Sequence, residues 1–424
     1  MFDFDGDSIA AAAAASPAFA IRARYWTADV VFGMGDEAYR LEMRDGVVAR
    51  FARDSSGAPA NVLVSGPAEA WEKLLSAVPP PGADDPLITG LRSGLSVRGE
   101  VAREVAPYYP AIQEFIAVLR GAHSGPSPVR AVPDVQRKFD AAVGRYIYVT
   151  LGGVQHRIYF EEAGHGPVPL LLQHTASAEG SQWRFLLEDP DFQRMFRMIA
   201  YDLPYHGKSL PPTSVRWWEQ DYKLTKARLI ETVLAISGGL ELDRPVYMGC
   251  SVGGFLAPDL ALACPEAFRA IVGINAGLGI DPARWHDEIE NTYLNPRVGD
   301  VWKGAVNVGL TAPTSPEALR REVGWVYSKS APQAMWGDIY YYAHDHDLTE
   351  EQARSIDTSR TPLYLLTCEY DVLATDDGTA RLARAIPGAK FQIIPGLGHF
   401  GPAENPEDFK AALAPVFEEI AGLP

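Results

Sequence analysis

Three polar side chains of the types used in acyl transfer occur far apart in the chain. Ser251 lies within Gly-Cys-Ser-Val-Gly (residues 249–253), His399 lies in a glycine-rich segment, and Asp371 follows a hydrophobic run. A serine hydroxyl is a poor nucleophile at neutral pH and needs a nearby base that a third group orients. These residue types predict a nucleophile, a base and an orienting carboxylate.

Each of the three residues follows a segment typical of a buried strand. Residues 245–249 run straight into the serine, and a helical pattern begins at Phe255. This strand, sharp turn and helix form the context of a nucleophile elbow, whose glycines leave room for the turn. Asp371 follows the apolar residues 363–366, and His399 follows residues 391–394. We therefore expect all three side chains at one edge of a sheet.

The elements that must position these residues form an α/β pattern. From about residue 140 onward, short apolar runs alternate with helical segments, which is typical of a mostly parallel sheet covered by helices on both faces. About eight strands are expected on this pattern. An opening pair of strands joined by Gly152-Gly153 is expected at residues 146–151 and 157–161, and the apolar runs cover residues 168–172, 198–201, 246–248, 270–274, 363–366 and 391–394.

In their order and strand-end placement, Ser251, Asp371 and His399 resemble the triad of α/β-hydrolase-fold serine hydrolases. The resemblance covers residues 140–424, and Tyr-Asp-Leu-Pro-Tyr-His-Gly-Lys-Ser (residues 201–209) matches a structural turn of that family. It implies an α/β-hydrolase fold with a helical cap at about residues 277–360, and neither a cofactor nor a metal ion. His206 in the turn is expected to be a buried, hydrogen-bonded side chain.

The acidic member of the triad has two rivals. Glu369 shares the strand-end loop of Asp371, and Asp281 follows the strand before the cap, where some relatives supply the acid. The family's acid lies in the loop past the last apolar strand position, which favours Asp371. The family often has a proline four residues later, where this chain has Thr375.

The resemblance also assigns the donors of an oxyanion hole. One is the backbone N–H of Val252, the residue after the nucleophile. The second comes from the loop after the third strand, where His174 and Thr175 stand in place of the usual His-Gly. We assign this donor to Ala176, with Thr175 as the alternative, and the threonine leaves the conformation of the loop open.

The expected cap is rich in aromatic residues, which could form an apolar wall for a substrate or simply pack the cap. The predicted substrate-binding residues are His174, Thr175, Trp285, Trp302, Trp336 and Tyr341. The segment His-Asp-His-Asp (residues 344–347) is expected to be solvated, because four adjacent ligands do not converge easily on one ion.

A smaller α+β domain is expected at residues 1–130. Its boundary lies within a linker rich in glycine and proline at residues 121–133. Its hairpin around Asp45-Gly46, a helix near Trp71 and a late strand ending at Gly99 resemble the SCP2-like sterol-carrier fold. The resemblance implies a module that binds apolar ligands. The alternative is a packing or assembly module.

The composition limits the partners and supports two domains, residues 1–130 and 131–424. The length of 424 residues suits two domains at roughly 100–200 residues each. The net charge of −16 disfavours nucleic acid and anionic lipid, and three cysteines fit no disulfide framework. With no apolar stretch of about 20 residues, we expect a cytoplasmic protein without membrane or nucleic-acid partners. A homo-oligomer stays open.

Together these features predict a serine hydrolase whose substrate is a small molecule, an ester or lactone with a bulky hydrophobic group. Hydrolysis of a carbon–carbon bond in a diketone uses the same triad and is the first alternative. A non-enzymatic carrier or sensor of apolar ligands is the second. Epoxide hydrolase and haloalkane dehalogenase chemistry are disfavoured, because both need a carboxylate in place of Ser251.

Overall fold

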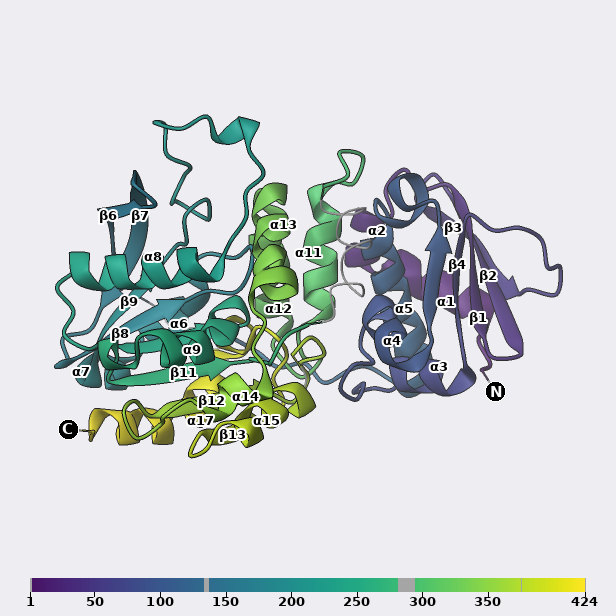
Figure 1. Ribbon diagram of the computed structural model, residues 1–424. Coiled ribbons are helices and arrows are strands. Elements are labelled where there is room, and N and C mark those ends of the chain that lie inside the picture. Colours follow the sequence, from purple (N-terminus) through teal and green to yellow (C-terminus); the bar gives the residue numbers. More distant parts are fainter. Residues whose placement is uncertain (1, 133–136, 281–293, 375, 424) are drawn as a thin grey trace. The chain divides into compact units, whose positions relative to one another are not determined.

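The computed structural model describes residues 2–132, 137–280, 294–374 and 376–423. The chain forms two compact units, whose elements are labelled in Figure 1. The first unit comprises Met1–Ala131 and Asn295–Ser328, and the second comprises Val132–Leu294 and Lys329–Pro424. Each unit is therefore built from two separate stretches of sequence.

The first unit contains a five-stranded sheet with the order β3-β2-β1-β4-β5. Strands β1 and β4 are parallel, and the other neighbours are antiparallel. The strands are β1 (Ala28–Met34), β2 (Glu37–Arg44), β3 (Val47–Arg53), β4 (Val62–Gly66) and β5 (Ser96–Gly99). The helices before residue 131 are α1 (Gly6–Ala15), α2 (Pro17–Arg22), α3 (Ala68–Leu74), α4 (Pro86–Ser93), the π-helix η1 (Val101–Val105) and α5 (Tyr109–Ser124).

The expected hairpin is confirmed, but Val48 rather than Val47 lies on the face of the sheet that packs against the core. Its turn is Asp45-Gly46, where both residues have positive φ angles of 48° and 81°, as a two-residue hairpin turn requires. A β-bulge before Met43 then shifts the register, so that Met43 lies opposite Val48. Val48 therefore packs against the core, while Val47 is exposed.

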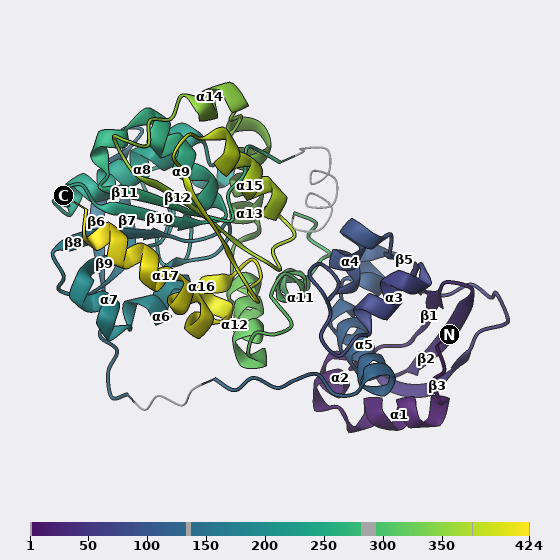
Figure 2. The ribbon, with the colours of Figure 1, turned by 90° about the horizontal axis from the view of Figure 1, so that it is seen from below.

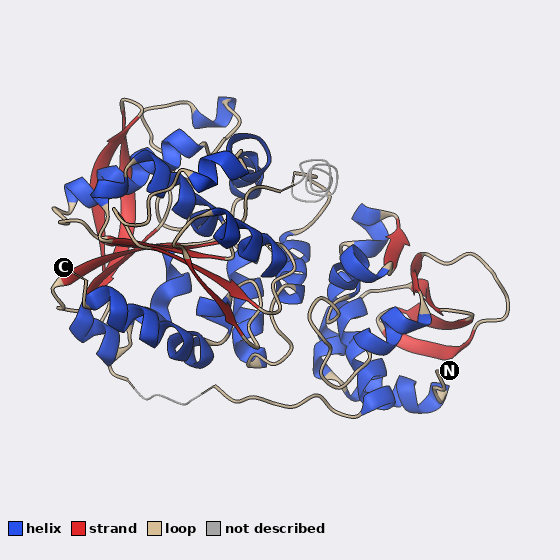
Figure 3. Ribbon diagram, turned by 60° about the horizontal axis from the view of Figure 1, so that its bottom comes forward, coloured by secondary structure: helices blue, strands red, loops and turns tan. Residues whose placement is uncertain are grey.

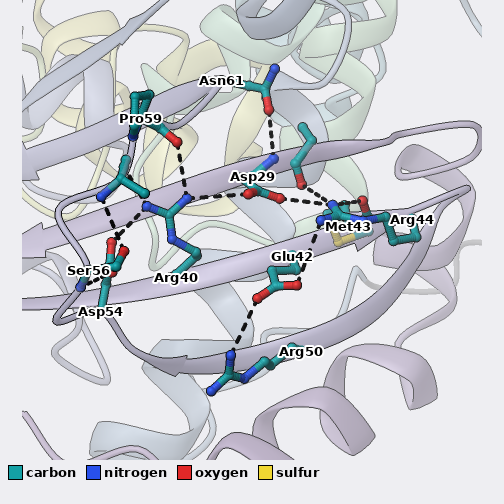
Figure 4. A network of polar contacts seen from close by, with 12 residues as sticks. Asp29, Arg40, Glu42, Met43, Arg44, Arg50, Asp54, Ser56, Pro59 and Asn61 are labelled. Atoms are coloured by element: carbon teal, nitrogen blue, oxygen red, sulfur yellow. Dashed lines mark hydrogen bonds and ion pairs between the residues drawn. The ribbon is translucent and has the colours of Figure 1, made fainter.

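The outer face of this sheet carries a network of charged side chains (Figure 4). Arg40 binds Asp29 at 3.4 Å and Asp54 at 2.9 Å, and Arg44 binds Asp29 at 2.9 Å and Glu42 at 3.7 Å. The pairs of Arg44 are the exposed ones, and ion pairs of that kind contribute little stability individually. Because they leave this face polar, the hydrophobic core lies on the opposite face, under the helices.

Helices α11 (Asp300–Gly309) and α12 (Glu317–Ser328) complete the first unit. The ring of Trp302 contacts Tyr109 of α5 at a centroid distance of 4.9 Å, and Asp84 forms an ion pair with Arg320. Gln113 donates a hydrogen bond of 3.0 Å to the carbonyl of Ala305. This segment lies within the expected cap of the second domain, at about residues 277–360, whereas Trp302 and Ala305 of α11 belong to the core of the first unit.

The second unit contains an eight-stranded, mostly parallel sheet with the order β13-β12-β11-β10-β8-β9-β7-β6. The six strands β8 to β13 are all parallel to one another. Strand β7 is antiparallel to β9, and β6 is antiparallel to β7. The strands are β6 (Val143–Leu151), β7 (Val154–Ala163), β8 (Val168–Gln173), β9 (Phe196–Tyr201), β10 (Val246–Cys250), β11 (Ala270–Ile274), β12 (Leu363–Cys368) and β13 (Lys390–Ile394). All eight predicted strands are confirmed.

Helices cover both faces of this sheet (Figure 3). One hydrophobic core lies under α8 (Lys226–Gly239), α9 (Val252–Ala263) and α15 (Asp376–Ala385). The other lies under α6 (Arg184–Leu187), α7 (Pro190–Met195) and α17 (Pro406–Ala421), which Figure 2 shows from their side. The sheet residues alternate between the two cores, as Leu171 and its neighbour Leu172 illustrate.

The remaining elements of the second unit connect these layers. They are η2 (Gly180–Trp183), η3 (Trp217–Glu219), η4 (Pro265–Ala267), α13 (Pro332–Tyr340), the π-helix η5 (Tyr341–Asp345), α14 (Glu350–Arg354) and α16 (Gly401–Glu404). Over the residues that the structure describes, no helix combines the length and apolar character needed to cross a membrane.

Replacing Trp302 by alanine tests the place of α11 in the first unit. Because the indole is buried against Tyr109, Trp302→Ala should lower the free energy of unfolding by about 3–5 kcal/mol, measured by chemical denaturation followed by circular dichroism. Trp325 of α12 is 73% exposed, so Trp325→Ala should change this free energy by less than about 0.5 kcal/mol. Unchanged stability in Trp302→Ala would contradict the packing role.

Candidate active site

Three neighbouring parallel strands end at the same edge of the sheet. In the register, Cys250 of β10 lies opposite Ile274 of β11, and Ile274 lies opposite Leu366 of β12. Ser251 directly follows β10, and Asp371 lies in the loop after β12. Because all three strands run in one direction, their carboxyl ends bring these two residues close together.

Ser251 occupies a sharp turn between β10 and α9. Its φ angle is 55°, a left-handed conformation that costs free energy for any residue with a Cβ atom. The neighbouring glycines are required by space. A Cβ atom on Gly254 would lie 2.0 Å from the carbonyl oxygen of Ile274, and one on Gly249 would lie 2.5 Å from the backbone of Gly253. The predicted elbow geometry is therefore present.

A continuous chain of hydrogen bonds joins a hydroxyl, an imidazole and a carboxylate. The Oγ atom of Ser251 lies 3.0 Å from Nε2 of His399, and Nδ1 of His399 lies 3.0 Å from Oδ1 of Asp371. The same Oδ1 atom accepts a hydrogen bond of 2.8 Å from the N–H of Leu373, which orients the carboxylate. All three side chains of the chain are buried.

Of the two described candidates for the acid, only Asp371 contacts the imidazole. Glu369 is exposed, and its Oε2 atom accepts a hydrogen bond of 2.8 Å from the N–H of Gly396. Asp281 and Thr375 lie outside the described residues.

The loop that carries His399 is held by Asn275, which directly follows β11. The Nδ2 atom of Asn275 donates a hydrogen bond of 3.1 Å to the carbonyl of His399, and its Oδ1 atom accepts one of 2.9 Å from the N–H of Cys368. One amide therefore connects the strand end that precedes Asp371 to the base. The sequence analysis does not single out Asn275, although a polar residue directly after a buried strand is a usable signal.

The loop after β8 contains the expected second oxyanion donor, Ala176. The N–H of Thr175 donates to Oε1 of Gln182 at 2.8 Å, and the N–H of Ser177 donates to Oδ2 of Asp338 at 2.7 Å. The left-handed residue of this loop is Ser177, with a φ angle of 57°. The φ angle of Thr175 is not positive, so a threonine in place of glycine causes no backbone strain there.

His174 is fully buried and ties the β8 loop to the loop after β9. Its Nε2 atom accepts a hydrogen bond of 3.0 Å from the N–H of Leu203, so Nδ1 carries the proton and donates it to the carbonyl of Thr175 at 2.7 Å. Burial, with repulsion from His206, lowers the pKa of His174 to about 3. His174 is therefore neutral. Its predicted contact with a substrate stays a prediction, as does that of Thr175, which is also buried.

His206 is buried, as expected, and forms an ion pair with Asp338 of α13. Its Nε2 atom lies 2.8 Å from Oδ2 of Asp338, and Nδ1 lies 2.9 Å from the carbonyl of Pro204. Both nitrogens face acceptors, which favours the doubly protonated ring. Burial acts to lower the pKa of His206, but the charge and hydrogen bond of Asp338 and the Pro204 carbonyl together raise it above its ordinary value.

The π-helix η5 carries two tyrosines with different partners. The hydroxyl of Tyr341 donates a hydrogen bond of 2.7 Å to Oδ2 of Asp259 in α9. The hydroxyl of Tyr342 lies 2.7 Å from Oγ of Ser251. Tyr341 is one of the six predicted substrate-binding residues, whereas its neighbour Tyr342 contacts the hydroxyl of Ser251.

The other predicted aromatic contacts are placed as follows. Trp336 is half-buried on α13, and Trp302 lies in the core of the first unit. Trp285 lies outside the described residues. Their binding roles stay predictions.

The expectation that residues 344–347 are solvated is wrong for His346. This side chain is buried, and its Nδ1 atom lies 2.8 Å from Oδ2 of Asp259. Its Nε2 atom lies 3.1 Å from the carbonyl of Gly277. His344 and Asp347 are exposed.

Comparison with known proteins gives a consistent family. The model of the family described as "Alpha/beta hydrolase family" matches residues 165–412. The chain is similar to a 2-hydroxy-6-oxononadienedioate/2-hydroxy-6-oxononatrienedioate hydrolase of Paraburkholderia phymatum, with 26% identity over 295 residues that cover 65% of this chain and 95% of that protein.

Solved structures share the fold of the second unit. A thermophilic esterase from Thermogutta terrifontis has a TM-score of 0.55 at 17% identity and covers 65% of this chain and 99% of its own. The enol-lactonase from Burkholderia xenovorans has a TM-score of 0.54 at 18% identity and covers 64% and 100%. At these identities, the likeness shows the fold alone.

The His206–Asp338 pair predicts a pH-dependent stability. Because the pKa of His206 is raised in the folded protein, its stabilising contribution is complete below the unfolded pKa and is lost as the pH rises through the folded pKa. Wild type should therefore lose more stability than His206→Gln between about pH 6 and pH 9, measured by chemical denaturation. His174→Asn is the control from about pH 7 upward, where His174 is neutral in the folded protein and largely neutral in the unfolded chain. Parallel profiles for wild type and His206→Gln would contradict the charged pair.

Proposed function

This chain belongs to the α/β hydrolase family, and we propose that it is a serine hydrolase that cleaves an ester or lactone bond in a bulky hydrophobic molecule. The observation that carries the proposal is the buried chain of contacts from Ser251 through His399 to Asp371, with 3.0 Å at each step. These distances allow the Ser251 proton to pass to His399 without rearrangement, while Asp371 stays hydrogen-bonded to Nδ1.

In the proposed mechanism, the carboxylate sets the tautomer of the base. Asp371 accepts a hydrogen bond from the Nδ1–H group, which keeps the proton on Nδ1 and leaves Nε2 of His399 free to accept the proton of the Ser251 hydroxyl. As this proton moves to Nε2, Oγ forms a bond to the carbonyl carbon and the carbonyl π electrons move to its oxygen. The oxyanion lone pair then re-forms the carbonyl, the bond from carbon to the leaving oxygen breaks, and the imidazolium gives its proton to that oxygen, which leaves as the alcohol. Water repeats these steps on the acyl-enzyme and releases the acid.

Backbone donors stabilise the negative charge on the carbonyl oxygen. Val252 is the first residue of α9, where backbone N–H groups have no acceptor within the helix and carry the positive end of its dipole. Ala176, in the loop anchored by Asp338 and Gln182, is the proposed second donor. One such donor is worth about 10²–10³ in rate in serine hydrolases.

The hydrophobic character of the proposed substrate rests on the segment between β11 and β12. Met335, Trp336 and Ile339 on α13 are half-buried, and Phe255 packs its ring against Tyr342 at a centroid distance of 5.1 Å. Partly exposed apolar side chains on the helix whose Asp338 binds the Ser177 backbone favour a substrate with an apolar acyl or alcohol group.

Hydrolysis of a carbon–carbon bond is the alternative, favoured by the relative from Paraburkholderia phymatum. The name of its substrate includes carboxylate, ketone and hydroxyl groups but no ester. A hydrolase acting on such a compound must therefore break a carbon–carbon bond. The same nucleophile and base serve this reaction, so turnover of a diketone acid without turnover of any ester or lactone would select the alternative.

The likeness of the first unit to SCP2-like carriers stays a prediction. Large aromatic side chains fill its interior, among them Trp26, Phe32, Trp71 and Phe115. Because α11 and α12 also belong to this unit, its packing supports the alternative that the first unit is a packing or assembly module.

Covalent labelling tests the proposed nucleophile. A fluorophosphonate probe should label the wild-type protein, and Ser251→Ala should abolish both the label and the hydrolysis of a nitrophenyl ester, while its circular dichroism spectrum stays unchanged. Thr232 of α8 is a buried hydroxyl that bonds the carbonyl of Arg228 at 2.7 Å, so Thr232→Ser provides a control that should keep the label. Full esterase activity in Ser251→Ala would refute the mechanism.

Two neighbouring carboxylates allow a matched test of the acid. Asp371→Asn should lower kcat by about 10³–10⁴, because the amide no longer stabilises the required tautomer of His399. Glu369→Gln should leave kcat within about twofold of wild type, since Glu369 is exposed and binds the backbone N–H of Gly396 rather than the imidazole of His399. The reverse ranking of the two variants would reassign the acid to Glu369.

A further inference from the structure

The hydroxyl of Tyr342 is a donor to the nucleophile. Ser251 Oγ has one proton, and in the free enzyme this proton points to Nε2 of His399, because Nδ1 is already protonated toward Asp371. Oγ can therefore only accept a hydrogen bond from a second partner. The Tyr342 hydroxyl, 2.7 Å away, must donate its proton to Oγ.

We propose that Tyr342 is a further catalytic residue, whose hydroxyl passes its hydrogen bond from Oγ of Ser251 to the carbonyl oxygen of the substrate as the tetrahedral intermediate forms. Tyr342 thus joins Val252 and Ala176 as a side-chain donor to the oxyanion. This inference rests on the proposed hydrolase function and adds a residue that family membership alone does not assign.

The chemistry of the attack explains why the bond moves. In the free enzyme, Oγ is a neutral hydroxyl with lone pairs that accept the Tyr342 proton. When the Oγ–C bond forms, the Ser251 proton goes to Nε2 of His399 and the carbonyl π electrons become an alkoxide lone pair. Oγ is then a weakly accepting ether-type oxygen, whereas the neighbouring alkoxide is an anion bonded to the same carbon. A donor within reach of both atoms binds the anion more strongly.

Because of this change, the hydrogen bond of Tyr342 lowers the reaction barrier and does not only stabilise the folded site. A hydrogen bond that is stronger in the transition state than in the ground state lowers the barrier of the chemical step. A low-dielectric surrounding increases the effect, and Tyr342 is nine-tenths buried. The Tyr342 proton remains on its own oxygen throughout, so the step needs no further proton acceptor.

The Tyr342 ring is held from several sides. Phe255 of α9, one turn after Ser251, meets the ring edge to face at a centroid distance of 5.1 Å and an interplanar angle of 89°. The preceding Tyr341 is anchored to Asp259 at 2.7 Å, and His346 closes the turn on the same carboxylate at 2.8 Å. Asp259 also binds Lys226 at 3.2 Å.

The π-helical turn explains the separation of the two tyrosines. Such turns insert an extra residue into helical geometry and frequently occur at functional sites. Here Tyr341 is directed to a buried carboxylate, and its neighbour is directed to the nucleophile. The anchored turn therefore holds the Tyr342 hydroxyl in place before a substrate binds, which avoids an ordering cost during the reaction.

Two variants without the hydroxyl test the proposal in the full-length protein. Tyr342→Phe keeps the ring contact with Phe255, and Tyr342→Met provides a second hydroxyl-free side chain in case the first variant misfolds. Each should lower kcat for ester hydrolysis by about 10²–10³ with little change in KM. The affinity for an alkyl boronic acid, which mimics the tetrahedral intermediate, should fall by a similar factor.

Tyr340→Phe is the matched control. Tyr340 precedes the turn and is half-buried, with Lys223 5.2 Å above its ring. This variant should keep kcat and boronate affinity within about twofold of wild type, because its phenyl ring preserves that packing.

The dependence on the leaving group identifies the oxygen that Tyr342 contacts. A loss of rate that is equal for nitrophenyl and alkyl esters supports donation to the oxyanion. A loss that grows with the pKa of the leaving alcohol would overturn the proposal, because Tyr342 would then act on the leaving group. Wild-type rates and boronate affinity in both variants would overturn it as well.

Failure of this proposal is distinguishable from failure of the proposed function. If the fluorophosphonate labels Ser251 and Tyr342→Phe keeps full activity, only the role of Tyr342 is wrong. If wild type is neither labelled nor active on any ester, lactone or diketone, the hydrolase function is wrong, and the role of Tyr342 falls with it.

Discussion

The close approach of α9 to the carboxyl ends of β10 and β11 is the constraint on which the site depends. The contact leaves no room for a Cβ atom at Gly254 and turns the backbone of Ser251 into a left-handed conformation. Packing of the surrounding buried sheet offsets the free-energy cost of that conformation, and its strands determine where the turn can lie. Asn275, at the end of β11, extends the same packing to the backbone of His399.

Two buried carboxylates connect the segment between β11 and β12 to the nucleophile region. Asp338 of α13 accepts the N–H of Ser177 and pairs with His206, so it holds the loop of the proposed oxyanion donor. Asp259 of α9 binds Tyr341 and His346, so it holds the turn that carries Tyr342. Buried charges are tolerated only when they are paired and hydrogen-bonded. The two pairs therefore tie α13 and η5 to specific positions above the sheet.

Most of the fold was predictable from local patterns. Eight runs predict the eight strands, and the reason is clearest for β10, β11 and β12, which are buried at every position and must therefore be apolar along their length. The membership of α11 and α12 was not predictable. An amphipathic helix shows that one face is buried but does not indicate the partner, and Trp302 suits a cap as well as the core against Tyr109. The bulge before Met43 likewise moved Val48 to the core face without a signal in the alternation.

For the site, the sequence by itself determined the elbow and the candidates for base and acid. Glycines beside Ser251 and polar residues directly after apolar runs are local features with local causes. Tertiary structure alone decided between Asp371 and Glu369, and between Tyr342 and Tyr341. The physical reason is that these choices depend on side-chain directions set by a strand-end loop and a π-helical turn. Those directions follow from contacts with residues 27 to 91 positions away, which no short segment of sequence records.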